Sequence, residues 1–244
     1  MICAGNWKLN KDPQEATSFI TQLLKDASTS EQKQLVVLPP ALCLSSVMQS
    51  LQGAAVQVGG QNCDWHLSGA FTGENSPSTL AAMGAKFCLV GHSERRQLFA
   101  ESDEMIARKI KVLQGQKITP IFCIGETLEE REEALTNKVL GRQLQVGLSE
   151  LEPGAPLWIA YEPVWAIGTG KVATTDQVLG THQFIREWLS KHHPALAQVP
   201  LLYGGSVKPD NAKELGKLPN VDGFLIGGAS LEVPSFLGIL RASV

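Results

Sequence analysis

The chain has 244 residues, of which 43% are hydrophobic and 18% are charged, and its formal net charge is −3 at pH 7. This composition is typical of a globular protein with a substantial core. The slightly negative charge provides no basic surface for nucleic acid or an anionic membrane, so neither is an expected partner. No apolar run approaches the roughly 20 residues of a membrane helix.

The five cysteines are odd in number and widely spaced, without a C-x-x-C pair. This spacing argues against a disulfide framework or a zinc site and favours a reducing compartment. Residues 1–8 lack the basic region and long apolar run of a secretory signal peptide. We therefore expect a cytoplasmic protein.

Short apolar runs recur along the chain, and each is apolar almost throughout, which is typical of buried parallel strands. The runs predict strands at residues 2–4, 35–38, 56–59, 87–90, 118–124, 157–161, 201–203 and 223–226.

Helix signals lie between these runs. Asp12 is followed by Pro13 and Glu15, which together form a cap, a proline in the first turn and a capping-box glutamate. We interpret the acidic run 129–133 as a solvated helical face. Further helices are expected to begin at Ser76, Ser102, Thr174 and residues 208–210, and to cover about 44–51 and 137–150.

Strand-then-helix units recur at regular intervals, without a linker or a low-complexity segment. The pattern predicts an α/β protein built as a single (β/α)8 barrel, the TIM-barrel architecture, over residues 1–244. A doubly wound open sheet is the alternative, but it usually carries a glycine-rich turn after its first strand. Here that turn is Gly5-Asn6-Trp7-Lys8, so the barrel is favoured.

Conspicuous polar residues and glycines follow the predicted strands. In a barrel of this kind, the C-terminal ends of the strands meet at one mouth, where active sites form. The pattern therefore predicts one functional site, to which nearly every unit contributes: Asn6, Lys8, Gln61, Asn62, His92, Ser93, Glu94, Glu126, Glu162, Ser206 and the glycine pairs 204–205 and 227–228.

Glu162 ends an apolar run and begins a segment with Pro163 at one end and Gly168 and Gly170 at the other. Proline restricts one hinge and glycine frees the other, so we interpret residues 163–170 as a lid over a catalytic base. An ordinary surface turn is the alternative for this segment taken alone.

His92 precedes Ser93 and Glu94, either of which can begin a short helix whose positive end favours a neutral imidazole. Lys8 lies in a tight turn after the first strand, and we interpret it as a functional cation. The other histidines lie in predicted loops or helices and are expected at the surface: His66, His182, His192 and His193.

The glycine pairs follow the last two strands, where loops of this fold commonly bind phosphate through backbone N–H groups. Residues 168–171 resemble a nucleotide P-loop only superficially, because Val172 replaces the required Ser or Thr. A base, a neutral imidazole, an ammonium group, a phosphate loop and a lid suit proton abstraction beside a carbonyl of a small phosphorylated molecule. The sequence shows no metal-ligand cluster, and we expect neither a metal nor a cofactor.

Five motifs resemble those of the triosephosphate isomerase family in order, over essentially the whole chain: residues 5–8, 91–96, 161–171, 203–208 and 227–231. The family interconverts dihydroxyacetone phosphate and D-glyceraldehyde 3-phosphate through an enediol(ate), without a cofactor, in glycolysis and gluconeogenesis. By this resemblance, Glu162 moves the carbon-bound proton and His92 polarises the carbonyl. Lys8 and Asn6 would stabilise the developing charge.

The resemblance also assigns supporting residues. Glu94 would lie close to Lys8, and Cys123 would be the small residue behind the base. Ile167 and Leu225 would cover the base. The substrate phosphate would be held at Gly168, Ser206, Gly227 and Gly228.

Residues 61–77 resemble the loop that docks into a neighbouring subunit, which implies a homodimer. Thr72 would approach Asn6 and His92 of the partner subunit. Leu9, Asn75 and Ala100 stand where the family more often has Met, an apolar residue and Gly. The expected dimer contacts are Gln61, Thr72, Gly73 and Glu74.

Two other functions stay open at this point. A different phosphate-binding barrel isomerase could act on a larger sugar phosphate, but the short loops disfavour it. A non-catalytic protein with the same fold is expected to lack Glu162, His92 or Lys8, and all three are present.

Overall fold

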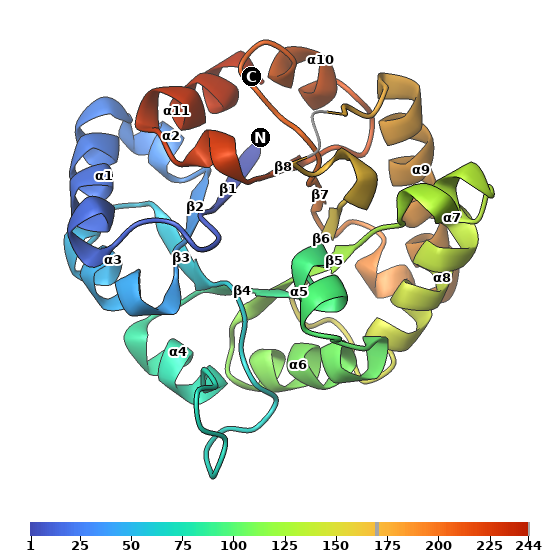
Figure 1. Cartoon of the computed structure of the whole chain (residues 1–244), viewed down its shortest axis with the longest axis horizontal. Coiled ribbons are helices and arrows are strands. Elements are labelled where there is room, and N and C mark those ends of the chain that lie inside the picture. Colours follow the sequence, from blue (N-terminus) through green and yellow to red (C-terminus); the bar gives the residue numbers. More distant parts are fainter. Residues whose placement is uncertain (169–170, 244) are drawn as a thin grey trace.

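The computed structural model describes residues 1–168 and 171–243, and within them eight parallel strands close into a barrel in chain order (Figure 1). Each strand pairs with its sequence neighbours, and β8 pairs with β1 to complete the ring. The predicted (β/α)8 barrel is therefore confirmed. The strands are β1 (Ile2–Asn6), β2 (Leu35–Leu38), β3 (Gln57–Gly60), β4 (Phe87–Val90), β5 (Thr119–Ile124), β6 (Trp158–Tyr161), β7 (Leu201–Tyr203) and β8 (Gly223–Ile226).

The helices form a ring outside the barrel (Figure 1). The α-helices are α1 (Pro13–Asp26), α2 (Thr29–Gln32), α3 (Leu44–Ser50), α4 (Pro77–Met83), α5 (Ser93–Leu98), α6 (Asp103–Gly115), α7 (Leu128–Glu132), α8 (Thr136–Gly147), α9 (Thr175–His192), α10 (Ala212–Gly216) and α11 (Val233–Ala242). Short 3-10 helices are η1 (Ala41–Cys43), η2 (Val164–Ala166), η3 (Pro194–Leu196) and η4 (Gly228–Ser230).

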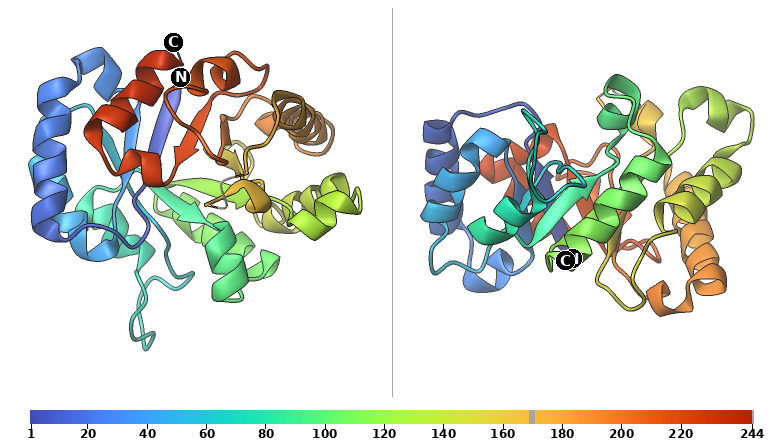
Figure 2. Two further views of the ribbon diagram at one scale, coloured as in Figure 1. Left: turned by 45° about the horizontal axis from the view of Figure 1, so that its top comes forward. Right: turned by 90° about the horizontal axis from the view of Figure 1, so that it is seen from below.

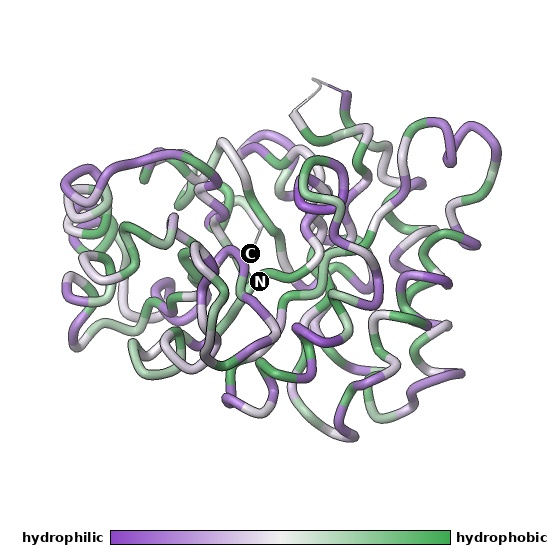
Figure 3. Tube along the Cα trace, turned by 60° about the horizontal axis from the view of Figure 1, so that its bottom comes forward, coloured by the Kyte–Doolittle hydropathy of each residue, from purple (hydrophilic) through white to green (hydrophobic). Residues whose placement is uncertain are grey.

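The core has two layers, because successive side chains of a strand point to opposite sides of the barrel wall. One layer fills the barrel and includes Val36, Leu38, Leu89, Ile121 and Leu202. The larger layer lies between the strands and the helices. Along the helices, hydrophilic and hydrophobic segments alternate in the trace, as one buried face per helix requires (Figure 3).

Local signals set most helix starts. Asp12 caps α1 through a complete capping box with Glu15, and Ser76, Ser102 and Thr174 cap α4, α6 and α9 as predicted. The acidic run contributes to α7, which is capped by Thr127.

Three predicted boundaries were wrong, and one of them is the end of the helix expected over about 137–150, which stops at Gly147. β1 continues past Ala4 to Asn6, because Gly5 and Asn6 pair with Val37 and Leu38 of β2. The helix expected to begin at 208–210 begins at Ala212 instead. There the Lys208 N–H donates to the side chain of Asn211 at 2.8 Å, so residues 208–211 form a turn before the helix.

The prediction that His182 lies at the surface was also wrong, because this side chain is fully buried on α9. Sequence position alone placed it in a helix but did not show which face of that helix meets the barrel.

The loop of residues 61–76, between β3 and α4, extends well away from the body of the molecule (Figure 2). Asp64 ties its two ends together by donating its N–H to the Asn75 carbonyl at 2.9 Å. Among the described residues, no helix is long and apolar enough to cross a membrane.

Candidate active site

The C-terminal ends of the strands surround a pocket of about 280 Å³. Sequence reasoning gave no role to Asn10 and Lys208, which also line it; Asn10 lies in a loop without a motif, whereas Lys208 ends the motif 203–208. The structure thus gathers at one mouth residues that are far apart in the chain. The predicted site residues that line this pocket are Asn6, Lys8, His92, Glu162, Ile167, Gly168, Gly204, Gly205, Ser206, Leu225, Gly227 and Gly228.

Glu162 directly follows β6 and is only 2% exposed. Its carboxylate accepts a hydrogen bond from the Ser93 backbone N–H at 2.9 Å, and its other oxygen lies 3.0 Å from His92 Nε2. Both contacts come from the start of α5. The carboxylate is therefore held in a dry position beside the imidazole.

Two glycines make room for Glu162. A Cβ at Gly204 would lie 2.9 Å from Glu162 Cγ, and one at Gly125 would lie 1.7 Å from its carbonyl oxygen. Cys123 is buried nearby, and burial, together with the negative charge of Glu162, raises the pKa of its thiol well above the usual range. Cys123 is therefore a neutral thiol near pH 7.

His92 caps the N-terminus of α5, and its Nδ1 accepts a hydrogen bond from the Glu94 N–H at 3.3 Å. A nitrogen that accepts has no proton, so in a neutral ring the proton is on Nε2. Nε2 is the nitrogen that faces Glu162. This pattern assigns the uncharged tautomer, with its N–H directed toward the pocket.

Lys8 stands beyond β1 in a left-handed backbone conformation with φ of 52°. Its N–H donates to Asn6 Oδ1 at 3.0 Å, and its ammonium lies 2.5 Å from Glu94. Gln61 fixes the same turn by donating to the Lys8 carbonyl at 2.9 Å. These contacts hold the ammonium at the pocket wall, although Glu94 itself lies outside the pocket lining.

The segment predicted to be a lid begins with η2. The Val164 N–H donates to the Glu126 carbonyl at 3.1 Å, and Trp165 Nε1 donates to Glu126 Oε1 at 3.0 Å. Tyr161 and Arg131 donate to the same carboxylate oxygen at 3.1 and 2.9 Å. Sequence reasoning noted Glu126 as polar but missed this role, because its partners come from three separate segments. Gly170, the predicted far hinge, lies outside the described residues.

A model of the triosephosphate isomerase family matches residues 1–243 of the chain. The chain belongs to the triosephosphate isomerase family. A triosephosphate isomerase of Bdellovibrio bacteriovorus is 48% identical over 235 residues, which are 96% of each chain. Those of Carboxydothermus hydrogenoformans and Rhodopirellula baltica are 46% and 42% identical, over 99% and 100% of this chain and 98% and 97% of theirs.

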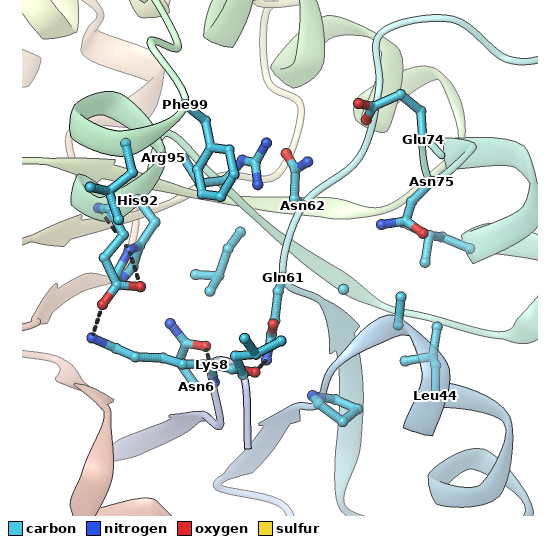
Figure 4. A pocket seen from close by; sticks show the side chains of 18 of the residues that line it. Asn6, Lys8, Leu44, Gln61, Asn62, Glu74, Asn75, His92, Arg95 and Phe99 are labelled. Carbon is cyan, nitrogen blue, oxygen red and sulfur yellow. Dashed lines mark hydrogen bonds and ion pairs between the residues drawn. The ribbon is translucent and has the colours of Figure 1, made fainter. Parts of the chain in front are cut away.

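A second, larger pocket of about 550 Å³ lies beside the first and shares Asn6, Lys8 and His92 with it. Figure 4 shows residues of the 61–76 loop facing the start of α5 across this space. Three predicted dimer-contact residues, Gln61, Gly73 and Glu74, line it together with Leu9, Asn75 and Phe99. Thr72 is exposed in the loop and is absent from this lining.

Ala100, where glycine is more common in the family, has a φ of 54°. That left-handed conformation favours glycine, the residue that the resemblance leads one to expect here. The loop is fixed by Glu101, which accepts from Arg95 at 2.5 Å and from Lys109 at 2.6 Å.

Proposed function

We propose that the 280 Å³ pocket interconverts dihydroxyacetone phosphate and D-glyceraldehyde 3-phosphate through an enediol(ate), the reaction of its family, without a cofactor. One observation carries the proposal. A buried carboxylate, Glu162, faces the N–H of a neutral imidazole, His92, in a pocket that also holds the ammonium of Lys8. These are the groups that a proton transfer beside a carbonyl requires.

In the proposed reaction, Glu162 removes a proton from the carbon beside the carbonyl and returns it to the other carbon. His92 Nε2–H and the Lys8 ammonium face the substrate oxygens, where negative charge develops. Asn6 orients Lys8, because the Asn6 side-chain oxygen accepts a hydrogen bond from the Lys8 backbone N–H. Because His92 and Ser93 hold the carboxylate in the free protein, it exchanges these partners for the substrate when a ligand enters.

The phosphate is assigned to the glycine side of the pocket. Gly168, Ser206, Gly227 and Gly228 line it, and glycine lets backbone N–H groups approach an anion closely. Leu225 is buried and Ile167 is half-buried near the base, which keeps water from the carboxylate. Without this enclosure the enediolate would tend to lose its phosphate.

A coupled assay from each triose phosphate, with Glu162→Ala run beside the unchanged chain, tests the proposal. We expect turnover in both directions and its collapse in the variant. A folded, unchanged chain that turns over neither triose phosphate would contradict the proposal. Thermal-shift screening with larger phosphorylated sugars would then test the alternative substrate class.

We also propose that the chain forms a homodimer through the larger pocket. Exposed apolar side chains surround this pocket: Leu9 is 98% exposed, Leu98 74% and Phe99 61%. The 61–76 loop projects far enough to reach a second copy (Figure 2). Sedimentation velocity at micromolar concentration tests this, and a monomer there would count against it. A cytoplasmic location is proposed as well, since the five cysteines are free and buried.

A further inference from the structure

The buried histidine of α9 connects two tyrosines at the active end of the barrel. The His182 ring centroid lies 5.9 Å from that of Tyr161 and 6.4 Å from that of Tyr203. These tyrosines end β6 and β7 and face each other in the strand register. All three side chains are at most 1% exposed, so they form one aromatic cluster behind the pocket wall.

Tyr161 contacts Glu126, the residue that holds the first end of the lid. Its hydroxyl donates to Glu126 Oε1, the oxygen that also accepts from Trp165, and Glu126 holds Val164 through its backbone carbonyl. Burial raises the pKa of Tyr161 well above the usual range, so the hydroxyl keeps its proton and continues to donate. The orientation of this ring therefore affects where η2 lies.

Tyr203 lies on the phosphate side of the pocket. Burial raises the pKa of its hydroxyl to about 12, and the nearby backbone N–H of Ala173, just beyond the lid, acts against this rise. A Cβ at Gly205 would lie 2.1 Å from the same hydroxyl, so the tyrosine fills the space behind that glycine. Gly205 lines the pocket.

His182 itself is held in a single form. Its Nδ1 lies 2.8 Å from the Asn220 carbonyl oxygen, which can only accept, so Nδ1 carries the proton. Arg186 holds Asn220 in turn by donating to its side chain at 3.3 Å. Within the described part of the chain, His182 Nε2 has no hydrogen-bond partner. An unpaired buried acceptor destabilises a fold, so an aliphatic side chain would serve better if filling space were the only role here.

We propose that His182 is a positioning residue for the isomerisation, because it orients Tyr161 and Tyr203 together and thereby sets the first end of the lid and the position of Gly205 on the phosphate side of the pocket. The inference rests on the proposed function, since enclosure matters when an enediolate must be protected. In a loosened pocket, the electron pair of the enediolate forms a new carbon–carbon double bond while the carbon–oxygen bond to phosphate breaks. Inorganic phosphate then departs with the bonding pair.

The test compares ring-free and ring-bearing variants. His182→Gln and His182→Leu remove the ring, whereas His182→Phe keeps the ring contacts and loses the hydrogen bond to Asn220. Leu189→Ala is the matched control, because Leu189 is fully buried on the same helix, about two turns further along. For each folded variant, isomerisation and inorganic phosphate release are measured in the same reaction.

We expect the ratio of phosphate release to isomerisation to rise about tenfold in the ring-free variants. His182→Phe and Leu189→Ala should stay within about twofold of the unchanged chain. An unchanged ratio in the folded ring-free variants would overturn the proposal. An equal rise in Leu189→Ala would do the same, because general loosening would then account for it.

A second measurement does not need turnover. The chain is labelled with 5-fluorotryptophan, the Trp165 signal is assigned with Trp165→Phe, and 2-phosphoglycolate is added as an anionic analogue of the enediolate. We expect a ligand-dependent shift in the unchanged chain and in His182→Phe that is lost in His182→Gln. An equal shift in all three, or none in the unchanged chain, would overturn the positioning role. If the unchanged chain shows this pattern of ligand-dependent shifts but does not isomerise either triose phosphate, the proposed function alone is overturned.

Discussion

The two pockets at the barrel mouth differ in size, lining and proposed role. The larger, of about 550 Å³, is bordered by exposed apolar side chains and by the projecting 61–76 loop. The smaller, of about 280 Å³, contains the buried carboxylate of Glu162 and the glycine loops after β7 and β8. Volume therefore does not identify the chemistry here. A buried charge with oriented donors does.

The pockets are nevertheless coupled, because Asn6, Lys8 and His92 form a wall common to both. A group that fills the larger pocket would therefore contact residues proposed to act in the smaller one. This contact would give the proposed dimer a physical role in the chemistry. Substitutions in the two pockets should therefore lower turnover by different factors, in an order that can be predicted.

The largest effect is expected for the base of the smaller pocket. Glu162→Gln keeps the shape of the side chain but removes the proton acceptor, so turnover should fall about 10³-fold or more. The exposed substitution Glu152→Gln serves as the control. Steady-state kinetics beside thermal melting checks this, and a folded Glu162→Gln protein with ordinary turnover would leave the smaller pocket without its base.

Next in size is Lys8, which belongs to the wall that the pockets share. Lys8→Ala removes a positive charge from a half-buried site, and we expect turnover to fall about 10²- to 10³-fold, well beyond any loss of stability. Lys25→Ala, on the exposed face of α1, is the control. Near-normal turnover of folded Lys8→Ala would refute its role.

Glycines in the two pockets provide a paired comparison. Gly204→Ala places a methyl group 2.9 Å from Glu162 Cγ, and displacing the base should lower turnover about 10²-fold. Gly60→Ala, in the larger pocket, meets the side chains of Leu80 at 3.2 Å and Cys88 at 3.4 Å and lies away from the base, so turnover should change by no more than a few-fold. Equal kinetic losses would mean that the distinction between the pockets is wrong.

The stability of the fold in acid should depend on His182, which lies behind the wall of the smaller pocket. Burial lowers the pKa of His182 from 6.5 to about 4, against a smaller opposing effect of the Asn220 carbonyl and Asp222 and a small additional lowering by Arg186. As pH falls below about 6.5 the unfolded chain takes up the proton first, so this histidine lowers stability in acid, by about 2 kcal/mol between pH 7.5 and 5. His182→Gln should flatten this dependence in urea unfolding. If the free energy of unfolding of His182→Gln changes with pH as steeply as that of the unchanged chain, the lowered pKa of His182 is contradicted.

The smallest effect is expected in the loop proposed to fill a neighbour's larger pocket. Thr72→Ala removes one hydroxyl from the proposed dimer contact, and the loss of a single hydrogen bond there should lower turnover about fivefold. Thr21→Ala, exposed on α1, is the control. The measurement is made at protein concentrations where sedimentation shows a single species, and no difference between the two variants would remove Thr72 from the contact.

The sequence by itself determined the architecture and indicated which residues gather at the mouth of the barrel. Apolar runs such as 35–38 and 87–90 match their strands, and caps such as Asp12 and Thr174 set their helices, because both signals act between near neighbours. Polar residues after successive strands indicated one mouth, since parallel strands must end on the same side of the barrel.

Only the tertiary structure decided how polar groups are partnered. The extension of β1 to Asn6 depends on pairing with β2, and the burial of His182 depends on which face of α9 meets β6 and β7. Glu126 gains its role from Tyr161, Arg131 and Trp165, which no local pattern connects. Periodicity reports which residues favour burial, whereas the position of a buried polar group depends on the partners that the whole fold brings to it.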